Sequence, residues 1–221
     1  MQSSFEWCRE RSRYHWDLRR RDRASDYVHH MGRFEGDWQA EVAAAISQTH
    51  SVTWSNRKNY LGEQRQSPML AQELLDLDRA GADPDLVLTD RVDDVAQFPT
   101  LQRMVNWFGL DPVRSQIHVQ RTGQMFNWHI DKLYEYADDP ADVYRFVIML
   151  EDWQPGQFYC YGTYQYTHWQ AGDFHWFDWQ DVPHATANAS LQPRATLQAT
   201  GRASDITRQR VSGIWLDPVL V

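Results

Sequence analysis

The sequence predicts a mainly β protein whose C-terminal half forms an eight-strand jelly roll. From about residue 115 onward, short aromatic and β-branched segments alternate with turn residues, which is the pattern of closely spaced strands. No long helical segment separates these strands, so antiparallel pairing in a sandwich or barrel is expected in place of a parallel βαβ sheet. Helices are expected before the jelly roll, lying around it.

The expected strands are recognised by their apolar and β-branched residues. Pro-Gly at 155–156 and Ala-Gly at 171–172 supply turns between them. A last segment, residues 211–216, is expected to add an edge strand. The eight strands are expected at residues 116–120, 125–129, 144–150, 157–161, 164–169, 174–179, 184–189 and 194–200.

The first hundred residues are expected to be helical and irregular. Asp37 stands where the cap of a short helix would stand, and Ser67 before Pro68 marks the start of a helix over residues 69–80. Another short helix is expected over residues 100–108. This N-terminal region is expected either to buttress the β core or to close over it as a lid.

Length and composition favour one folded unit. With 221 residues, of which 42% are hydrophobic and 14% aromatic, the chain can bury a sizeable core. We treat residues 1–221 as a single domain, with a helical and irregular region at 1–112 and the β core at 113–221.

Charge, cysteine content and hydropathy limit the partners of the protein. A formal net charge of −8 argues against binding to duplex nucleic acid, because such binding depends largely on neutralising phosphates. The 2 cysteines form no disulfide framework, and no apolar run is long enough to span a membrane. We expect a cytoplasmic protein without a membrane partner, and the sequence indicates no particular oligomeric state.

Three residues form a candidate metal site. His129 and Asp131 lie at the end of an expected strand, where residues two apart point to the same face. His184 begins a later strand and supplies the third ligand. Two histidines and one carboxylate on one face leave the opposite coordination positions open, as in the facial triad of non-haem Fe(II) oxygenases. Geometry alone would also permit Zn, Mn or Co.

Arg194 is the candidate anchor for an acidic co-substrate. It starts the strand after His184, and a hairpin between these strands would return it to the metal site. A buried guanidinium needs an anionic partner, and a carboxylate held bidentately is the natural one. Thr196, two residues on, can donate a second hydrogen bond to that carboxylate. The alternative is an exposed arginine at a strand end.

These motifs resemble the 2-oxoglutarate/Fe(II)-dependent oxygenase superfamily. The resemblance covers about residues 115–201 and also includes the apolar strand 145–152 and Ala-Gly-Asp at 171–173. Residues 150–156 and 183–188 are similar to members encoded by bacteriophages and marine bacteria. The family fold is a double-stranded β-helix, a form of jelly roll that agrees with the strand count.

The resemblance implies a role for each matching residue. His129, Asp131 and His184 would bind Fe(II), while Arg194 and Thr196 would hold the distal carboxylate of 2-oxoglutarate, and O₂ would be the second co-substrate. Because position 131 is Asp, the halide-binding variant of the family is disfavoured. Hydroxylation of an unactivated C–H bond is the expected reaction, in an amino acid, a peptide or protein side chain, or another small molecule.

Two further residues are candidates for substrate contact. Arg145 begins the strand after the His-x-Asp turn and, facing inward, would hold a substrate carboxylate. Its alternative is a surface ion pair with Asp139 or Asp142. Trp176 lies on the strand before His184 and would shield the oxidising centre, with core packing as its alternative.

Two other functions fit the same pattern. A cupin-like metal enzyme would use the same ligands without 2-oxoglutarate and would leave Arg194 without a carboxylate partner. A non-catalytic jelly-roll binding module would place the histidines and Asp131 in solvent-facing loops and bind no iron.

Overall fold

The structure is a computed structural model, and it describes residues 28–55, 86–129, 131, 133, 135–162, 164–180, 182–213, 215 and 217–221. The side chains of residues 51–55, 86–89 and 127–129 are outside this description. The expected helix over residues 69–80 also lies outside the described residues. The single-domain organisation and its division at residue 112 stay predictions for the same reason.

The described residues form short strands with few helices between them. The helices are α2 (Gln39–Gln48), α5 (Pro99–Trp107) and α6 (Asp205–Val211), with 3₁₀ turns η2 (Val95–Gln97) and η3 (Pro140–Asp142). The strands are β1 (Val28–Glu35), β2 (His50–Ser55), β3 (Leu86–Val92), β4 (Val113–Gln120), β5 (Met125–His129), β6 (Val143–Met149), β7 (Gln157–Tyr161), β8 (Tyr164–Tyr166), β9 (Asp173–Phe177), β10 (His184–Asn188), β11 (Arg194–Arg202) and β12 (Val219–Leu220).

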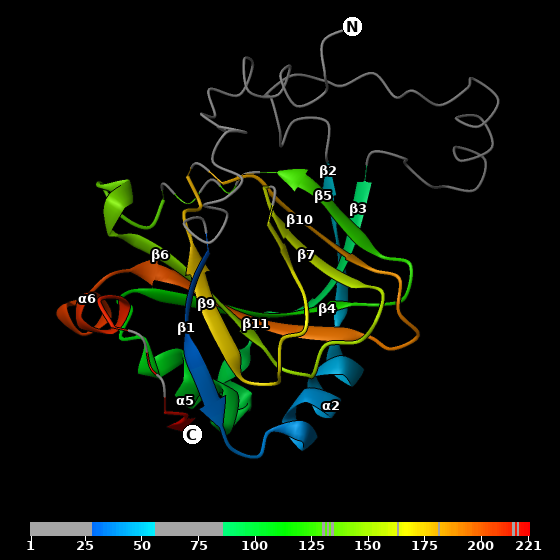
Figure 1. Ribbon diagram of the computed structural model, residues 1–221, viewed down its shortest axis with the longest axis horizontal. Helices are drawn as coiled ribbons and strands as arrows, with labels where there is room; N and C mark the ends of the chain where they lie inside the picture. The colour runs from blue at the N-terminus through cyan, green and yellow to red at the C-terminus, as the bar shows by residue number, and fades with distance from the viewer. Residues whose placement is uncertain are drawn as a thin grey trace, which may run out of the picture.

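Two β-sheets face each other in this part of the chain (Figure 1). The larger sheet has the order β12-β1-β9-β6-β11-β4-β3-β2, and the smaller sheet has the order β5-β10-β7-β8. Along the chain, β4 to β11 pass back and forth between the two sheets, and neighbouring strands of this set pair antiparallel. This topology is a jelly roll, so the predicted fold class is confirmed.

The N-terminal region departs from the expectation. Besides helix α2, it contributes strands β1, β2 and β3, which extend the larger sheet at both of its ends. The expectation of helical and irregular structure is therefore wrong for these three segments. In β1 the register shifts between His30 and Gly32, and this bulge breaks the alternation by which a strand is recognised in sequence.

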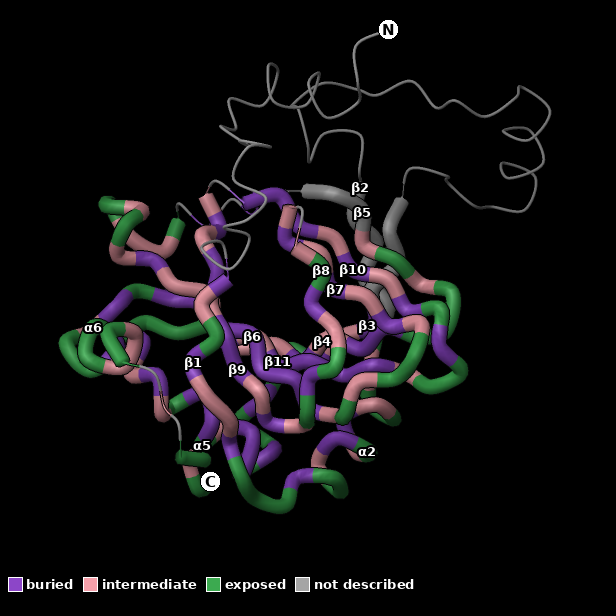
Figure 2. The backbone as a smooth tube through the Cα atoms, viewed as in Figure 1, coloured by how far each residue is buried: buried purple, intermediate pink, exposed green. Residues whose placement is uncertain are grey.

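Apolar side chains pack on both faces of the larger sheet, and buried residues recur along its strands (Figure 2). Alternate residues of β6 point to opposite faces, so Phe146 and Ile148 pack toward the helices while Val147 and Met149 pack toward the smaller sheet. The helix-facing core also contains Val42, Ala45, Leu101, Met104 and Phe108 from α2, α5 and its end. The two helices therefore cover the outer face of the larger sheet, and its inner face is left for the space between the sheets.

A carboxylate ties α2 to the first turn of α5. Glu41 of α2 accepts hydrogen bonds from the backbone amides of Thr100 and Leu101 at distances of 2.9 to 3.1 Å. These amides belong to the helix N-terminus, where they lack partners within the helix and favour negative charge. Glu41 therefore caps α5 from a neighbouring element.

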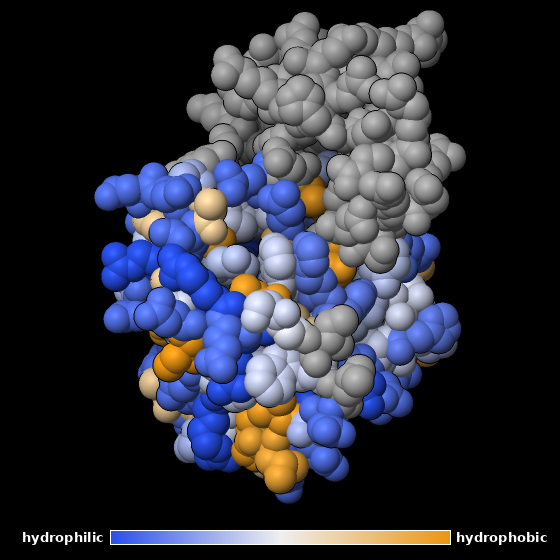
Figure 3. All heavy atoms as spheres, turned by 60° about the vertical axis from the view of Figure 1, so that its left-hand side comes forward, coloured by the Kyte–Doolittle hydropathy of each residue, from blue (hydrophilic) through white to orange (hydrophobic). Residues whose placement is uncertain are grey.

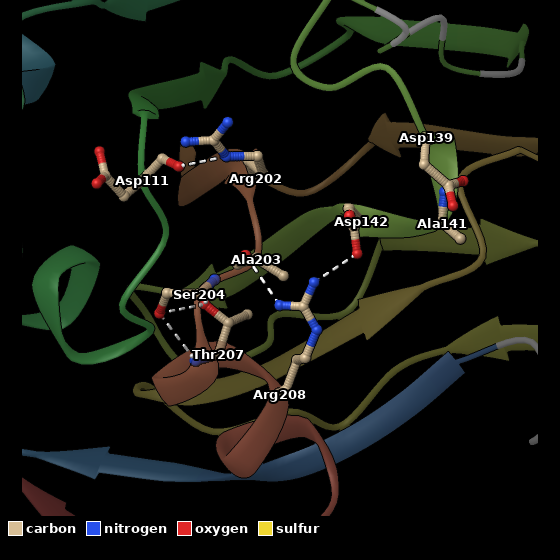
Figure 4. Close-up of polar contacts among 9 residues, drawn as sticks. All are labelled: Asp111, Asp139, Ala141, Asp142, Arg202, Ala203, Ser204, Thr207 and Arg208. Atoms are coloured by element: carbon tan, nitrogen blue, oxygen red, sulfur yellow. Dashed lines mark hydrogen bonds and ion pairs between the residues drawn. The ribbon is translucent and has the colours of Figure 1, made fainter.

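The C-terminal segment contains a helix that ends where an edge strand was expected to begin, over residues 211–216. Helix α6 begins at a capping box, in which the Ser204 hydroxyl accepts from the Thr207 amide and the Thr207 hydroxyl accepts from the Ser204 amide (Figure 4). Arg208 on this helix also forms an ion pair with Asp142 at 2.6 Å. The helix ends at Val211, so the expected strand is wrong, and only the short β12 pairs with β1 further on.

The surface over α6 and the adjoining strands is mainly hydrophilic, with an apolar area at its lower end (Figure 3). Among the helices of the described residues, none is both long enough and apolar enough to cross a membrane.

Candidate functional site

The inner face of the larger sheet is polar along β4 and β11. Their outer-facing residues, such as Ile117 and Leu197, belong to the helix-facing core. The alternate residues face the smaller sheet and pair across the two strands. In order along β11 these pairs are Arg194 with Gln120, Thr196 with His118, Gln198 with Gln116, and Thr200 with Arg114. A row of polar side chains thus runs between the sheets.

The predicted metal ligands come together at one end of the smaller sheet. His129 ends β5 directly opposite His184, the first residue of β10. Asp131 follows two residues later and is only 8% exposed. Its Oδ2 atom lies 3.7 Å from Nε2 of His184. The backbone register and this contact therefore bring all three positions to one place.

The donor atoms of Asp131 and His184 fit a divalent cation. Two ligands that share an ion through bonds of about 2.1 Å lie less than about 4.2 Å apart, and the observed separation is 3.7 Å. Among side chains that the structure describes, no three His, Cys, Asp or Glu residues form one metal site. The His129 side chain is outside this description, so the complete three-ligand set stays a prediction.

The surroundings of His184 favour a neutral imidazole. Its ring packs against the rings of Phe177 and Tyr161, with centroids 4.7 and 6.0 Å away. Burial lowers the pKa of His184, opposed by the nearby Asp131 carboxylate. Nδ1 lies 3.4 Å from the Val182 carbonyl oxygen. A proton on Nδ1 would leave the Nε2 lone pair directed at Asp131, as metal ligation requires.

Arg145 faces inward and contacts the candidate metal ligand. Its Nη1 donates to Oδ2 of Asp131 at 2.7 Å, and its Nε donates to the Thr200 hydroxyl at 2.9 Å. The alternative surface pair with Asp142 is not formed, since Asp142 pairs with Arg208. Arg145 thus supplies a positive charge beside the buried carboxylate. Contact with a substrate carboxylate stays a prediction.

Arg194 is buried at the opposite end of the polar row. It is 4% exposed, and its Nη1 donates to the carbonyl oxygens of Phe158 and Ala187 at 2.8 and 3.5 Å. Its Nη2 donates to Oε1 of Gln120, and its guanidinium carbon lies 4.6 Å from the centre of the Tyr159 ring. The alternative of an exposed strand-end arginine is therefore excluded.

The route by which Arg194 reaches this place differs from the expected hairpin. Strands β10 and β11 belong to different sheets, because the chain crosses from the smaller sheet to the larger one between them. Arg194 instead spans the gap between the sheets and donates to carbonyls of β7 and β10. The expected hairpin, which was to return Arg194 to the metal site, is therefore wrong.

The positive charge of Arg194 is not balanced by a described carboxylate. Burial lowers its pKa, and the groups that oppose this shift are Tyr159, Tyr161 and Cys160. In the described part of the chain its hydrogen-bond acceptors are neutral, and its Nε has no partner. A buried guanidinium remains charged and is costly without an anion. The surroundings of Arg194 therefore favour a negatively charged partner.

Trp176 does not take the position expected for a shield of the metal site. It packs against the helix-facing core, stacks on His29 with ring centroids 3.9 Å apart, and meets Tyr144 edge to face. Phe177, the next residue of β9, is the ring that packs against His184. The expectation for Trp176 is wrong, because alternate residues of a strand face opposite sides.

Several polar residues of the site were not singled out from the sequence. Gln120 links Arg194 to Thr186, whose hydroxyl accepts from Nε2 of Gln120 at 2.7 Å. The sequence does carry a signal for it, since Gln120 falls on the polar side of an alternating strand. His175 lies behind the site, with its Nε2 atom 2.6 Å from the Tyr161 hydroxyl.

Comparisons with known proteins found solved structures of low similarity. No protein-family model matches the chain, and no curated protein matches its sequence. The non-haem α-ketoglutarate-dependent epimerase SnoN from nogalamycin biosynthesis is 14% identical over 83% of this chain and 83% of its own, with a TM-score of 0.49. The viral collagen prolyl hydroxylase of Paramecium bursaria chlorella virus 1 is 13% identical over 81% of this chain and 97% of its own, with a TM-score of 0.43.

A more distant likeness involves a predicted oxalate decarboxylase from Thermotoga maritima. It is 11% identical over 52% of this chain and 82% of its own, with a TM-score of 0.34. At these levels of similarity no functional statement about the present chain rests on the comparisons. The case for its function rests on its own residues.

Proposed function

We propose that the protein is an Fe(II)- and 2-oxoglutarate-dependent dioxygenase that hydroxylates an unactivated C–H bond. The observation that carries the proposal is the buried Arg194 guanidinium, which has no carboxylate among its described partners. It faces the same space between the sheets as Asp131 and His184. A dicarboxylate co-substrate would satisfy the arginine at one end and reach the metal ligands at the other.

Each residue has a defined part in this proposal. His129, Asp131 and His184 would hold the metal, and Arg194 with Thr196 would hold the far carboxylate of 2-oxoglutarate. Thr196 supports this assignment because it is 2% exposed and lies two residues beyond Arg194 on the same face of β11. Iron bound there would supply the oxidation chemistry, in which O₂ and 2-oxoglutarate give succinate, CO₂ and a hydroxylated product.

The protein itself would supply orientation and exclusion of water. Phe177 and Tyr161, which are 1% and 0% exposed, cover the His184 ring on the side of β7 and β9. Arg145 holds the Asp131 carboxylate with a hydrogen bond of 2.7 Å. Residues that fix a ligand carboxylate in this way orient it toward the metal. The substrate is expected to be a small molecule or a peptide.

The decisive test measures succinate. Protein prepared without oxygen would be supplied with Fe(II), 2-oxoglutarate and O₂, and succinate formation would be compared between wild type, His184→Ala and the surface control His168→Ala. Wild type and the control should produce succinate, at least at the slow rate of uncoupled turnover, and His184→Ala should produce none. Identical succinate formation by wild type and His184→Ala would contradict the proposal.

Metal uptake and 2-oxoglutarate binding, measured on the same wild-type protein, separate the two other functions. Iron uptake without any 2-oxoglutarate binding would favour a cupin-like metal enzyme that works without this co-substrate. Failure of the wild-type protein to take up any divalent metal would favour a binding module. The unbalanced charge of Arg194 argues against both, since neither of them needs an anionic ligand at that position.

A further inference from the structure

A histidine on the inner face of β4 has an unsatisfied nitrogen. The Nε2 atom of His118 is shielded from solvent and has no hydrogen-bond partner in the described part of the chain. Buried polar groups in folded proteins are nearly always paired, so each exception calls for an explanation. A ligand that enters the space between the sheets would provide the missing partner.

The strand register places His118 between the two halves of the proposed site. It lies directly opposite Thr196, one pair along from Arg194 with Gln120 and two pairs before Thr200 with Arg114. Thr200 in turn accepts from Arg145, which contacts Asp131. We call the inner-face stretch from Arg194 to Thr200 the passage, and His118 forms part of its wall.

The charges that act on His118 agree with this position. Burial, and after it the guanidinium groups of Arg145 and Arg91, lower the pKa of His118 to about 3, while Asp93 and Asp131 act in the opposite direction. The imidazole is therefore neutral at physiological pH. A neutral imidazole has one N–H donor and one acceptor, so it can donate to a ligand oxygen without adding a charge to the passage.

We infer that His118 is a binding residue for the acidic co-substrate, donating a hydrogen bond from Nε2 to an oxygen of the 2-oxoglutarate bound between Arg194 and the metal ligands. This inference rests on the proposed function and adds to it a residue outside the metal ligands and the arginine anchor. In the ligand-free protein the unsatisfied nitrogen is destabilising, and bound co-substrate removes this penalty.

The inference predicts opposite effects on stability and on binding. His118→Leu removes the unsatisfied nitrogen, so the ligand-free protein should unfold at a temperature higher by about 2–4 °C. The same variant loses the hydrogen bond to the ligand, so its dissociation constant for 2-oxoglutarate should rise roughly tenfold or more. A residue with only a structural role would not produce this combination.

The experiment compares His118→Leu with His118→Gln and with the exposed control His50→Leu. Dissociation constants for 2-oxoglutarate would be measured by calorimetry without oxygen, with Co(II) in place of Fe(II), alongside ligand-free unfolding temperatures. His118→Gln keeps an amide donor and should retain affinity within about threefold, and the control should match wild type. Unchanged affinity in His118→Leu, or a lower unfolding temperature together with weaker binding, would overturn the inference.

Failure of the inference and failure of the proposed function give different results. If wild type binds 2-oxoglutarate and His118→Leu binds it equally well, the assignment of His118 is wrong and the proposed function stands. If wild type binds no 2-oxoglutarate in the presence of metal, the proposed function itself is wrong and the inference falls with it.

Discussion

Replacing Gln120 by Glu tests whether Arg194 is an anchor for a ligand carboxylate. Oε1 of Gln120 already accepts from Nη2 of Arg194, and Nε2 donates to the Thr186 hydroxyl at 2.7 Å. Gln120→Glu preserves the size of the side chain and puts a permanent negative charge against the guanidinium. The Thr186 hydroxyl can then donate where it formerly accepted. In this variant the protein itself provides the negative charge beside Arg194 that the ligand carboxylate is proposed to provide in the wild type.

The expected loss of affinity for 2-oxoglutarate arises because the positive charge of Arg194 is already neutralised in the variant. Two unit charges about 4 Å apart attract by about 4 kcal/mol at an effective dielectric constant of about 20. Removing this attraction corresponds to a rise of roughly a thousandfold in the dissociation constant of 2-oxoglutarate. Relaxation of the pocket reduces the effect, so we expect an increase of at least about a hundredfold.

The assay is calorimetric titration of 2-oxoglutarate into the metal-loaded protein without oxygen. Gln39→Glu, at the exposed first residue of α2, makes the same change of charge away from the pocket and should leave binding unchanged. Thermal unfolding of the ligand-free protein provides a second readout, because the paired guanidinium should make Gln120→Glu more stable than wild type. Wild-type affinity in Gln120→Glu would refute the idea that the charge of Arg194 anchors the co-substrate.

Two further predictions concern stability. Burial, together with His30, holds the pKa of His175 well below its usual value. Protonation of His175 therefore favours the unfolded chain. The free energy of unfolding should fall as the pH drops below about 6.5, by about 1.4 kcal/mol per pH unit. Urea unfolding at pH 7.5 and 5.5 should show a loss smaller by about 1.4 kcal/mol in His175→Gln, and equal losses would contradict this origin. Glu41→Ala removes the carboxylate cap of α5 and should cost about 1 kcal/mol in urea unfolding while leaving 2-oxoglutarate binding unchanged; an unchanged stability would show that the cap contributes nothing.

The C-terminal strands could be predicted closely because their sequence and their environment agree. The bounds of β5 and β7 are those expected, and β6, β10 and β11 differ by one or two residues. These strands are short, flanked by turn residues and rich in β-branched and aromatic side chains. Strand β8 ends earlier than expected, at Tyr166, and two residues later His168 has a positive φ of 60°, a conformation that interrupts a strand.

The N-terminal strands could not be predicted because tertiary contacts define them. Strand β1 has two adjacent histidines and a glycine, and its bulge removes the regular alternation. It pairs with β9, which lies far away in the sequence. No local sequence pattern therefore predicts this strand. Helix α6 is a different case, since Ser204 and Thr207 are spaced as a capping pair and the signal was present in the sequence.

The candidate site was predictable in its residue types and less so in their arrangement. His129, Asp131, His184 and Arg194 were predicted from their positions in the expected strands and from the family resemblance. The side chains that contact these residues could not be predicted. Arg145, for example, lies on β6 and contacts Asp131, which follows β5. Periodicity reports which face a residue occupies, and it does not report which side chain stands opposite in another sheet.

The alternation of β4 to β11 between the two sheets has a consequence for how such a protein can diversify. All residues proposed to bind metal or co-substrate lie on strands or, for Asp131, just after one. Apart from Asp131, the connections between strands, such as residues 189–193, contribute none of them. Insertions and substitutions in these connections can therefore alter what is recognised at the rim without disturbing the reaction centre. Descendants of one ancestral chain can acquire new substrates while inheriting the same chemistry.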